Sequence, residues 1–246
     1  MCRFVGSVPT EVKKAGHKVV IYLMRHSDPD YGSDGPRLLD LEAPIQFEGK
    51  LKEEGKNKIK LASCNLATEF GNMPEKSVIL ASSPRRRAVE SSVILERTLV
   101  ESGISVSRLE SKELQKLLTD ATLTGELLEE YGKQAEQNKN LTWMDFWINK
   151  SGDFKNVESA VDFKERMRDL ILYFQNFSQE TNSTIVCLTH EEEIKILAKI
   201  FGISILIVPN GGTLKMIINP EEMIVEVQGK SGSLSFEQFD MKEGRQ

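Results

Sequence analysis

The stretch VVIYLMRH at positions 19–26 determines how the rest of the sequence is interpreted. Its first six residues, Val19–Met24, are apolar and rich in β-branched side chains, which is typical of a strand buried on both faces. An arginine and a histidine follow directly. Open parallel sheets bind ligands at the carboxyl ends of their strands, so this position predicts a functional site.

Five further stretches share this apolar, β-branched character, and segments of helical periodicity lie between several of them. They are Val78–Ala81, Ile104–Val106, Thr184–Leu188, Leu214–Ile218 and Met223–Val227. The alternation of strands and helices predicts an α/β fold, a three-layer α/β/α sandwich with a mostly parallel central sheet of about six strands. We expect one more short strand around Leu234–Phe239.

Four segments with apolar residues every three or four positions predict the covering helices. These stripes run over Ile59–Leu66, Ala88–Leu99, Phe163–Phe177 and Ile194–Phe201. Gly202 is the expected C-cap of the last one. Ser159, with Asp162 three residues further on, is the expected start of the third.

The region Glu110–Lys155 is polar, with two weak helices near Leu123–Glu136 and Trp143–Asn149 and no convincing strand. A segment of about 45 residues buries too little apolar surface to fold alone. We therefore expect a single domain over residues 1–246 that carries a helical cap insertion at approximately 110–155.

The composition excludes several classes of protein. The chain has 246 residues, 39% of them hydrophobic, and its 32 basic and 37 acidic residues give a net charge of −5. This balance argues against binding to nucleic acid or to an anionic membrane. Three cysteines without a C-x-x-C pair, and no apolar run of bilayer length, predict a cytoplasmic protein without disulfides.

Two of the three histidines occur in the same context. His26 follows the first expected strand, and His190 follows Thr184–Leu188 and opens an expected helix. Two histidines in matching positions at one sheet edge indicate chemistry more strongly than either does alone. His17 has no such context, and we expect it at the surface.

The sequence SSPRRRA at positions 82–88 has a similar form, since it follows an expected strand and opens an expected helix. Proline is tolerated in the first turn of a helix. Three arginines in that turn oppose the helix dipole, which is unfavourable unless they face an anion. Backbone N–H groups and guanidinium groups both suit phosphate oxygens, so this segment predicts a phosphate site.

Several other phosphate chemistries lack their motifs. The chain contains no G-x-x-x-x-G-K-[ST], no G-x-G-x-x-G and no cysteine followed six positions later by arginine. Asp28-Pro29-Asp30 is interpreted as a turn, and HEEEI at positions 190–194 lacks the second histidine of a zinc helix. A metal held by His26, His190 and a carboxylate stays a minor alternative. We expect no cofactor.

Taken in order, these motifs resemble those of the histidine phosphatase superfamily, which includes phosphoglycerate mutase. The matching segments are LMRHS (23–27), LKEEG (51–55), SSPRRRA (82–88), VES (157–159) with Arg166, LTH (188–190) and PN (209–210). The resemblance covers most of the chain. It implies a metal-independent phosphatase that acts through a phosphohistidine intermediate.

The resemblance also implies roles for individual residues. His26 is the expected nucleophile, and Arg25, Arg87 and His190 are expected to bind the phosphoryl oxygens. Nucleophilic attack needs a neutral imidazole, and the neighbouring positive charges should disfavour protonation of His26. Glu113, in the sequence SKEL at positions 111–114, is the expected general acid. Glu110 and Asp120 are the alternatives.

The sequence departs from the family pattern in two places. Gly32 stands where members often carry an asparagine that helps to bind phosphate, and Glu191–Glu193 stand where many have small residues. Carboxylates at a helix start are favourable for the helix dipole. One that points into the pocket would repel a dianionic substrate.

The leading hypothesis is a phosphatase that acts on a small phosphorylated metabolite. The alternatives are a phosphoglycerate mutase-type phosphotransferase, a catalytically silent phosphate-binding protein, and an enzyme that hydrolyses phosphohistidine on a partner protein. The short polar insertion favours hydrolysis. The presence of both histidines with Arg25 and Arg87 argues against a silent protein.

Overall fold

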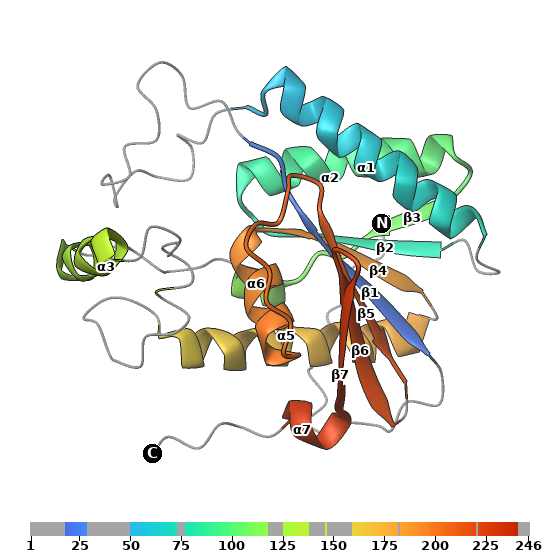
Figure 1. The fold of residues 1–246 in the computed structure, drawn as a ribbon. Coiled ribbons are helices and arrows are strands. Elements are labelled where there is room, and N and C mark those ends of the chain that lie inside the picture. The colour runs from blue at the N-terminus through green and yellow to red at the C-terminus, as the bar shows by residue number, and fades with distance from the viewer. Residues whose placement is uncertain are drawn as a thin grey trace.

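A seven-stranded sheet with helices on both faces organises the chain (Figure 1). The computed structural model describes residues 18–28, 50–72, 77–117, 125–137, 146, 159–181, 183–219 and 221–240. The strand order is β3-β2-β4-β1-β5-β6-β7. The strands are β1 (Val19–Arg25), β2 (Ser77–Ser82), β3 (Ser105–Arg108), β4 (Thr184–Thr189), β5 (Thr213–Ile218), β6 (Glu222–Val227) and β7 (Lys230–Ser235).

Strand direction divides this sheet into two halves. The neighbours β3, β2, β4 and β1 are parallel to one another. Beyond β1 each pairing is antiparallel, through β5 and β6 to β7. The four parallel strands therefore bring their carboxyl ends to the same edge of the sheet.

The helices form the two outer layers. Figure 1 shows α1 and α2 on one face of the sheet and α5 and α6 on the other. Their bounds are α1 (Glu53–Gly71), α2 (Arg86–Glu101), α3 (Gly125–Gln137), α5 (Ala160–Thr181), α6 (Glu191–Ile200) and α7 (Phe236–Asp240), with a 3₁₀ helix η2 at Lys112–Leu117. None of the helices among the described residues is long and apolar enough to cross a bilayer.

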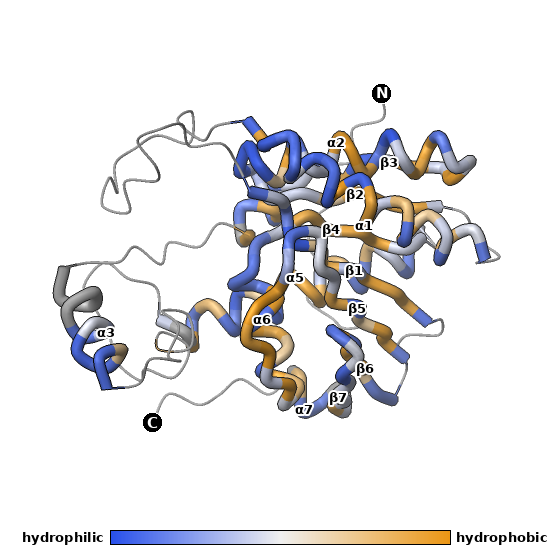
Figure 2. The backbone as a smooth tube through the Cα atoms, turned by 45° about the horizontal axis from the view of Figure 1, so that its top comes forward, coloured by the Kyte–Doolittle hydropathy of each residue, from blue (hydrophilic) through white to orange (hydrophobic). Residues whose placement is uncertain are grey.

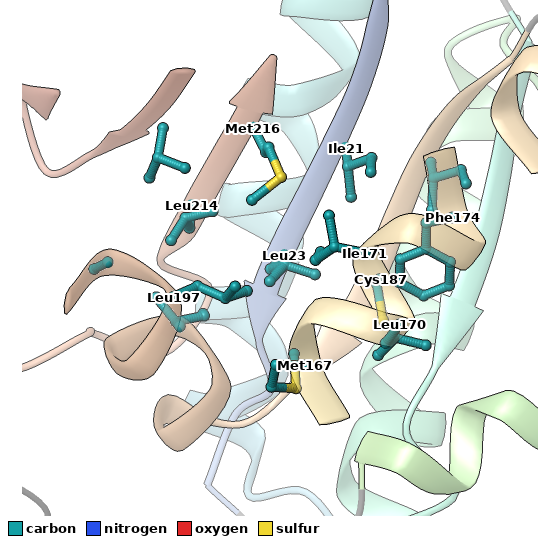
Figure 3. Close-up of a cluster of buried hydrophobic side chains, with 14 of the residues drawn as sticks. Ile21, Leu23, Met167, Leu170, Ile171, Phe174, Cys187, Leu197, Leu214 and Met216 are labelled. Carbon is teal, nitrogen blue, oxygen red and sulfur yellow. The ribbon is translucent and has the colours of Figure 1, made fainter. Parts of the chain in front are cut away.

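Successive side chains of β1 enter different halves of the core, because neighbouring residues of a strand point to opposite faces. Ile21 and Leu23 pack with α5 and α6 (Figure 3). Tyr22 and Met24 pack with α1 and α2. Figure 2 shows hydrophobic residues concentrated in β1, β5 and α6, as burial on both sides of the central strands requires.

The predicted α/β architecture is confirmed. All six expected strands occur within two residues of their predicted bounds, and the four expected helices are α1, α2, α5 and α6. Gly202 ends α6 with φ of 71°, and the N–H groups of Gly202 and Ile203 donate to the carbonyls of Lys199 and Ala198, both at 2.9 Å. This is the hydrogen-bond pattern of a glycine C-cap.

The expected strand around Leu234–Phe239 is wrong in its bounds. The last strand, β7, ends at Ser235, and Phe236 begins α7. The backbone N–H of Ser235 donates to Gln238 Oε1 at 2.9 Å, and that of Gln238 donates to Ser235 Oγ at 3.2 Å. This reciprocal pair is a capping box, which starts a helix where the apolar pattern alone suggested a strand.

Part of the expected insertion can be located. The helix expected near Leu123–Glu136 is α3, which Figure 1 shows to one side of the three layers. Of the helix expected near Trp143–Asn149, only Phe146 is among the described residues. The organisation as one domain with a cap at about 110–155 stays a prediction.

Candidate active site

Three neighbouring parallel strands deliver the main polar residues to one edge of the sheet. His26 follows β1, Ser83 follows β2 and His190 follows β4, which lies between β1 and β2. The His26 N–H donates to the Thr189 carbonyl at 2.9 Å, and the Ser83 N–H donates to the Leu188 carbonyl at 2.8 Å. These bonds continue the ladder beyond the strands and fix the backbone from which the side chains project.

The two histidines lie against each other. The ring centroids of His26 and His190 are 4.8 Å apart and the ring planes are inclined at 69°. His26 is 6% exposed and His190 is 4% exposed. Residues 164 positions apart in the sequence therefore form one buried pair, which the matching sequence contexts predict.

Arg87 completes this cluster from the first turn of α2. Its Nη2 lies 3.3 Å from His190 Nδ1. The helix begins at Arg86 with Arg85 as its N-cap, so Pro84 precedes the helix and the arginines extend over its boundary. Arg86 instead pairs with Glu90 on the same helix, Nε to Oε1 at 2.9 Å.

Hydrogen-bond partners assign the tautomers of both rings. A guanidinium only donates, so the Nδ1 of neutral His190 accepts from Arg87, and Nε2–H faces Ser83 Oγ at 2.9 Å. A carbonyl only accepts, so His26 Nδ1 carries the proton and donates to the Ser27 carbonyl at 2.6 Å. In the neutral ring of His26, Nε2 therefore carries the lone pair.

Burial and nearby cations keep both rings neutral. Desolvation, followed by the charge of Arg87, lowers the pKa of His26 to about 3. Desolvation is also the largest cause that lowers the pKa of His190 well below its ordinary value. Electrostatic interactions with His26 and Arg87 follow. At neutral pH the pair consists of two uncharged imidazoles, the state that a nitrogen nucleophile requires.

Arg25 ends β1 beside this pair. Its Nη1 donates to the Val208 carbonyl and lies 2.9 Å from Glu191 Oε2. The other carboxylate oxygen, Oε1, lies 3.3 Å from Lys195 Nζ and accepts from the Val208 N–H at 3.3 Å. Of the three glutamates that follow His190, Glu191 is thus the one that reaches a cation of the candidate site.

Glu193 points into the protein interior. It is fully buried, and its Oε2 accepts from the His190 N–H at 3.1 Å. Burial is the largest cause that raises its pKa, to about 8. Its hydrogen bond holds the backbone of His190 at the start of α6, a role that the sequence interpretation missed although glutamate at the third position of a helix is a capping signal.

Gly55 is the residue through which the LKEEG segment at positions 51–55 approaches the candidate site. A Cβ atom at this position would lie 2.5 Å from Ser27 Oγ, so only glycine allows the first turn of α1 to approach the residue after His26. The Ser27 N–H also donates to Ser91 Oγ of α2 at 3.3 Å. The residue after the expected nucleophile is therefore held from both helices of one layer.

Glu113, the expected general acid, lies in the first turn of η2, directly after β3. Its side chain is half-buried, and its N–H donates to Ser111 Oγ at 3.1 Å. Because β3 is parallel to β2 and next to it, η2 follows the same edge of the sheet as the histidines. Glu110 is exposed, whereas Asp120 and Gly32 lie outside the described residues.

No group of three or more histidine, cysteine, aspartate and glutamate residues that could hold a metal ion occurs in the part of the chain that the structure describes. Arg87 and Arg25 contribute to the lowered pKa of His26, and Arg87, Arg85 and Arg25 contribute to that of His190. This arrangement suits a group that carries several anionic oxygens, such as a phosphoryl group.

Neither a protein-family model nor a curated protein sequence matches the chain. Among solved structures, phosphoglycerate mutase from Bacillus anthracis str. Sterne aligns over 87% of this chain and 93% of the mutase, with 18% sequence identity and a TM-score of 0.60. Alpha-ribazole phosphatase from Shigella flexneri aligns over 88% and 95% of the respective chains, with 17% identity and a TM-score of 0.47. The chain therefore has the fold of phosphoglycerate mutase, as the resemblance of its motifs to the histidine phosphatase superfamily predicts.

Proposed function

We propose that this protein is a metal-independent phosphatase that hydrolyses small phosphomonoesters through a phosphohistidine at His26. The observation that carries the proposal is the buried pair of neutral imidazoles with ring centroids 4.8 Å apart. One ring is contacted by Arg87, and the pair lies at the ligand-binding edge of a phosphoglycerate mutase-like sheet. Nucleophile and oxyanion-binding groups therefore occur together.

In the first step, the lone pair of His26 Nε2 attacks phosphorus while the bond from phosphorus to the ester oxygen breaks. The ring becomes positively charged as the Nε2–P bond forms. The Nδ1–H bond to the Ser27 carbonyl, 2.6 Å long, stabilises that charge and keeps the ring oriented. In the second step, water attacks phosphorus, the Nε2–P bond breaks, and neutral His26 is restored.

Charge on the equatorial phosphoryl oxygens is held by groups already in place. Arg87 Nη2 lies 3.3 Å from His190 Nδ1, and a phosphoryl oxygen that approaches Arg87 takes over this donor. The N–H of neutral His190 is on Nε2, so His190 donates to a phosphoryl oxygen through that atom, in place of Ser83 Oγ at 2.9 Å. Such preorganised donors stabilise the transition state because they need little rearrangement when the charge develops. Arg25 supplies the second guanidinium.

We assign the leaving-group proton to Glu113, which would donate it to the departing alkoxide in the first step and regain it from water in the second. An acid matters most for leaving groups that are poor without protonation. Glu113→Gln should therefore slow alkyl phosphates by about 10²-fold and activated aryl phosphates much less. An equal effect on both substrate types would assign the acid elsewhere, and Glu110→Gln tests the first alternative in the same way.

A phosphoglycerate mutase-type phosphotransferase is the second candidate, favoured by the alignment with the mutase at a TM-score of 0.60. The two reactions share the phosphohistidine and differ in its acceptor. In a mutase the phosphoryl group returns to a hydroxyl of the bound sugar acid, so water must be kept out. Transfer to water supports the phosphatase, and transfer to a phosphorylated sugar acid supports the mutase.

The test is hydrolysis of a generic aryl phosphate by the purified protein in the presence of EDTA. The proposal predicts saturable release of inorganic phosphate that EDTA does not reduce. Activity that EDTA removes and a divalent metal restores would contradict the metal-independent mechanism. Binding of phosphate without any turnover, on a panel of phosphorylated metabolites, would indicate the silent phosphate-binding protein instead.

A further inference from the structure

Glu191 has an unusual position for a carboxylate beside a phosphate site. It is the first residue of α6, next to His190, and its side chain is 17% exposed. Its Oε2 lies 2.9 Å from Arg25 Nη1. The guanidinium that the proposed function assigns to the substrate therefore already has an anionic partner in the free protein.

Three groups hold Glu191 in this position. Besides Arg25, its carboxylate contacts Lys195 Nζ at 3.3 Å and the Val208 N–H at 3.3 Å. The side chain of Lys195 is only 4% exposed. Two cations and a backbone N–H thus converge on one carboxylate, which is a set of donors that would also suit an external anion.

The charge of the site depends on this contact. With both imidazoles neutral, Arg87 and Arg25 supply the positive charge next to His26, and Arg85 adds to it beside His190. The negative charge of the Glu191 carboxylate offsets the positive charge of Arg25, whichever edge of the guanidinium faces the substrate. A phosphomonoester dianion binds best where two positive charges face it, so an internal carboxylate weakens its binding.

We infer, on the basis of the proposed function, that the Glu191 carboxylate competes with the substrate phosphoryl group for Arg25. The free protein holds Arg25 on Glu191, and the bound phosphoryl group must share or displace that contact. Glu191 thereby sets the affinity for phosphate dianions and favours their release as product. His26 and Arg87 still perform the transfer itself.

The test measures binding of inorganic phosphate by calorimetry, which does not depend on turnover. Glu191→Gln keeps the size of the side chain and removes its charge, and it should tighten phosphate binding by about tenfold or more at low ionic strength. The KM for an aryl phosphate should fall with it. Glu192→Gln, one residue along the same turn, makes the same change in net charge and should have a much smaller effect.

Two further variants keep the result interpretable. The substitution leaves buried Lys195 without its carboxylate partner, so Glu191→Gln/Lys195→Gln provides a version in which both charges are removed and Arg25 is still released. It should also bind phosphate more tightly than the wild type. Arg25→Met in the Glu191→Gln background should abolish the gain, because the effect acts through that guanidinium.

Unchanged or weaker phosphate binding in both Glu191 variants would overturn the inference and make Glu191 a positioning residue for Arg25. If the wild type hydrolyses aryl phosphate at the same time, the proposed function stands without the inference. If the wild type and all variants neither bind nor hydrolyse phosphate compounds, the proposed function fails and the inference fails with it.

Discussion

The parallel and antiparallel halves of the sheet make different contributions to the protein. The parallel strands β1, β2 and β4 lead into the residues of the candidate site, namely His26, the segment that leads to Arg87, and His190. In the antiparallel half, buried and more exposed residues alternate along β5 and β6. Strand direction explains the difference, because only parallel neighbours end at a common edge.

The antiparallel half supports the site through its backbone. The turn before β5 exchanges hydrogen bonds with Arg25, from the Arg25 N–H to the Gly212 carbonyl at 2.9 Å and from the Gly211 N–H to the Arg25 carbonyl at 3.0 Å. The buried side chains of β5, such as Leu214 and Met216, belong to the core cluster (Figure 3). Substitutions in the two halves should therefore separate activity from stability.

The largest effect is expected from His26→Ala. Removing the nucleophile should lower hydrolysis of an aryl phosphate by about 10³-fold or more, to background, because no phosphoenzyme can form. Circular dichroism should show an intact fold, and steady-state rates measure the loss. Activity within a few fold of the wild type would remove the nucleophile assignment and with it the functional meaning of the parallel half.

Arg87→Ala and His190→Ala should each reduce kcat by about 10²-fold, less than loss of the nucleophile, because each removes one donor to the phosphoryl oxygens. The two groups contact each other at 3.3 Å, so the double variant should lose less than the product of the single effects. Arg86→Ala is the matched control, since Arg86 pairs with Glu90. A loss in the control as large as that of Arg87→Ala would contradict the assignment.

Met216→Ala, in the antiparallel half, should lower stability and leave activity almost unchanged. Met216 is fully buried, so the substitution should lower the free energy of unfolding by about 2–5 kcal/mol through lost contacts and a cavity. Denaturant titration measures this change. The kcat per folded molecule should stay within about twofold of the wild type, and the exposed Val100→Ala should change neither quantity. A large loss of kcat with unchanged stability would show that the two halves are not separable.

Per pH unit, the smallest expected effect is the pH dependence of stability. The unfolded chain binds a proton at His26 near pH 6.5, whereas in the folded protein burial lowers the pKa to about 3. Between these values the unfolded state holds more protons, so acidification destabilises the fold, by up to about 1.4 kcal/mol per pH unit from this residue. Denaturant titrations between pH 7 and pH 4 should show a shallower slope for His26→Asn, and an unchanged slope would contradict the buried neutral ring.

The sequence was sufficient to predict most of the fold and to predict that His26 and His190 lie at one edge of the sheet. Apolar stretches located six strands, and the two strand-ending histidines identified the sheet edge. The strand order was not readable, because β4 enters between β1 and β2 although it is more than 100 residues from either. The two imidazoles are in contact because β4 lies next to β1 in the sheet.

Side-chain direction at the start of α6 was also beyond the sequence. The sequence does not distinguish the three consecutive glutamates from one another. In the structure, Glu191 contacts Arg25, whereas Glu193 is buried against the His190 backbone. Their directions follow from helix periodicity and from the loop that places Val208 beside Arg25, a tertiary contact without a local signal. The start of α7, in contrast, does have a local signal in the sequence, since Ser235 and Gln238 have the spacing of a capping box.

Trapping of the phosphoenzyme tests the central claim most directly. The protein would be mixed briefly with an aryl phosphate that carries labelled phosphorus, denatured in alkali and mapped by peptide mass spectrometry. The account predicts acid-labile label on His26 alone and none in His26→Ala. Label on another residue, or normal turnover by the wild type without any label on His26, would contradict it.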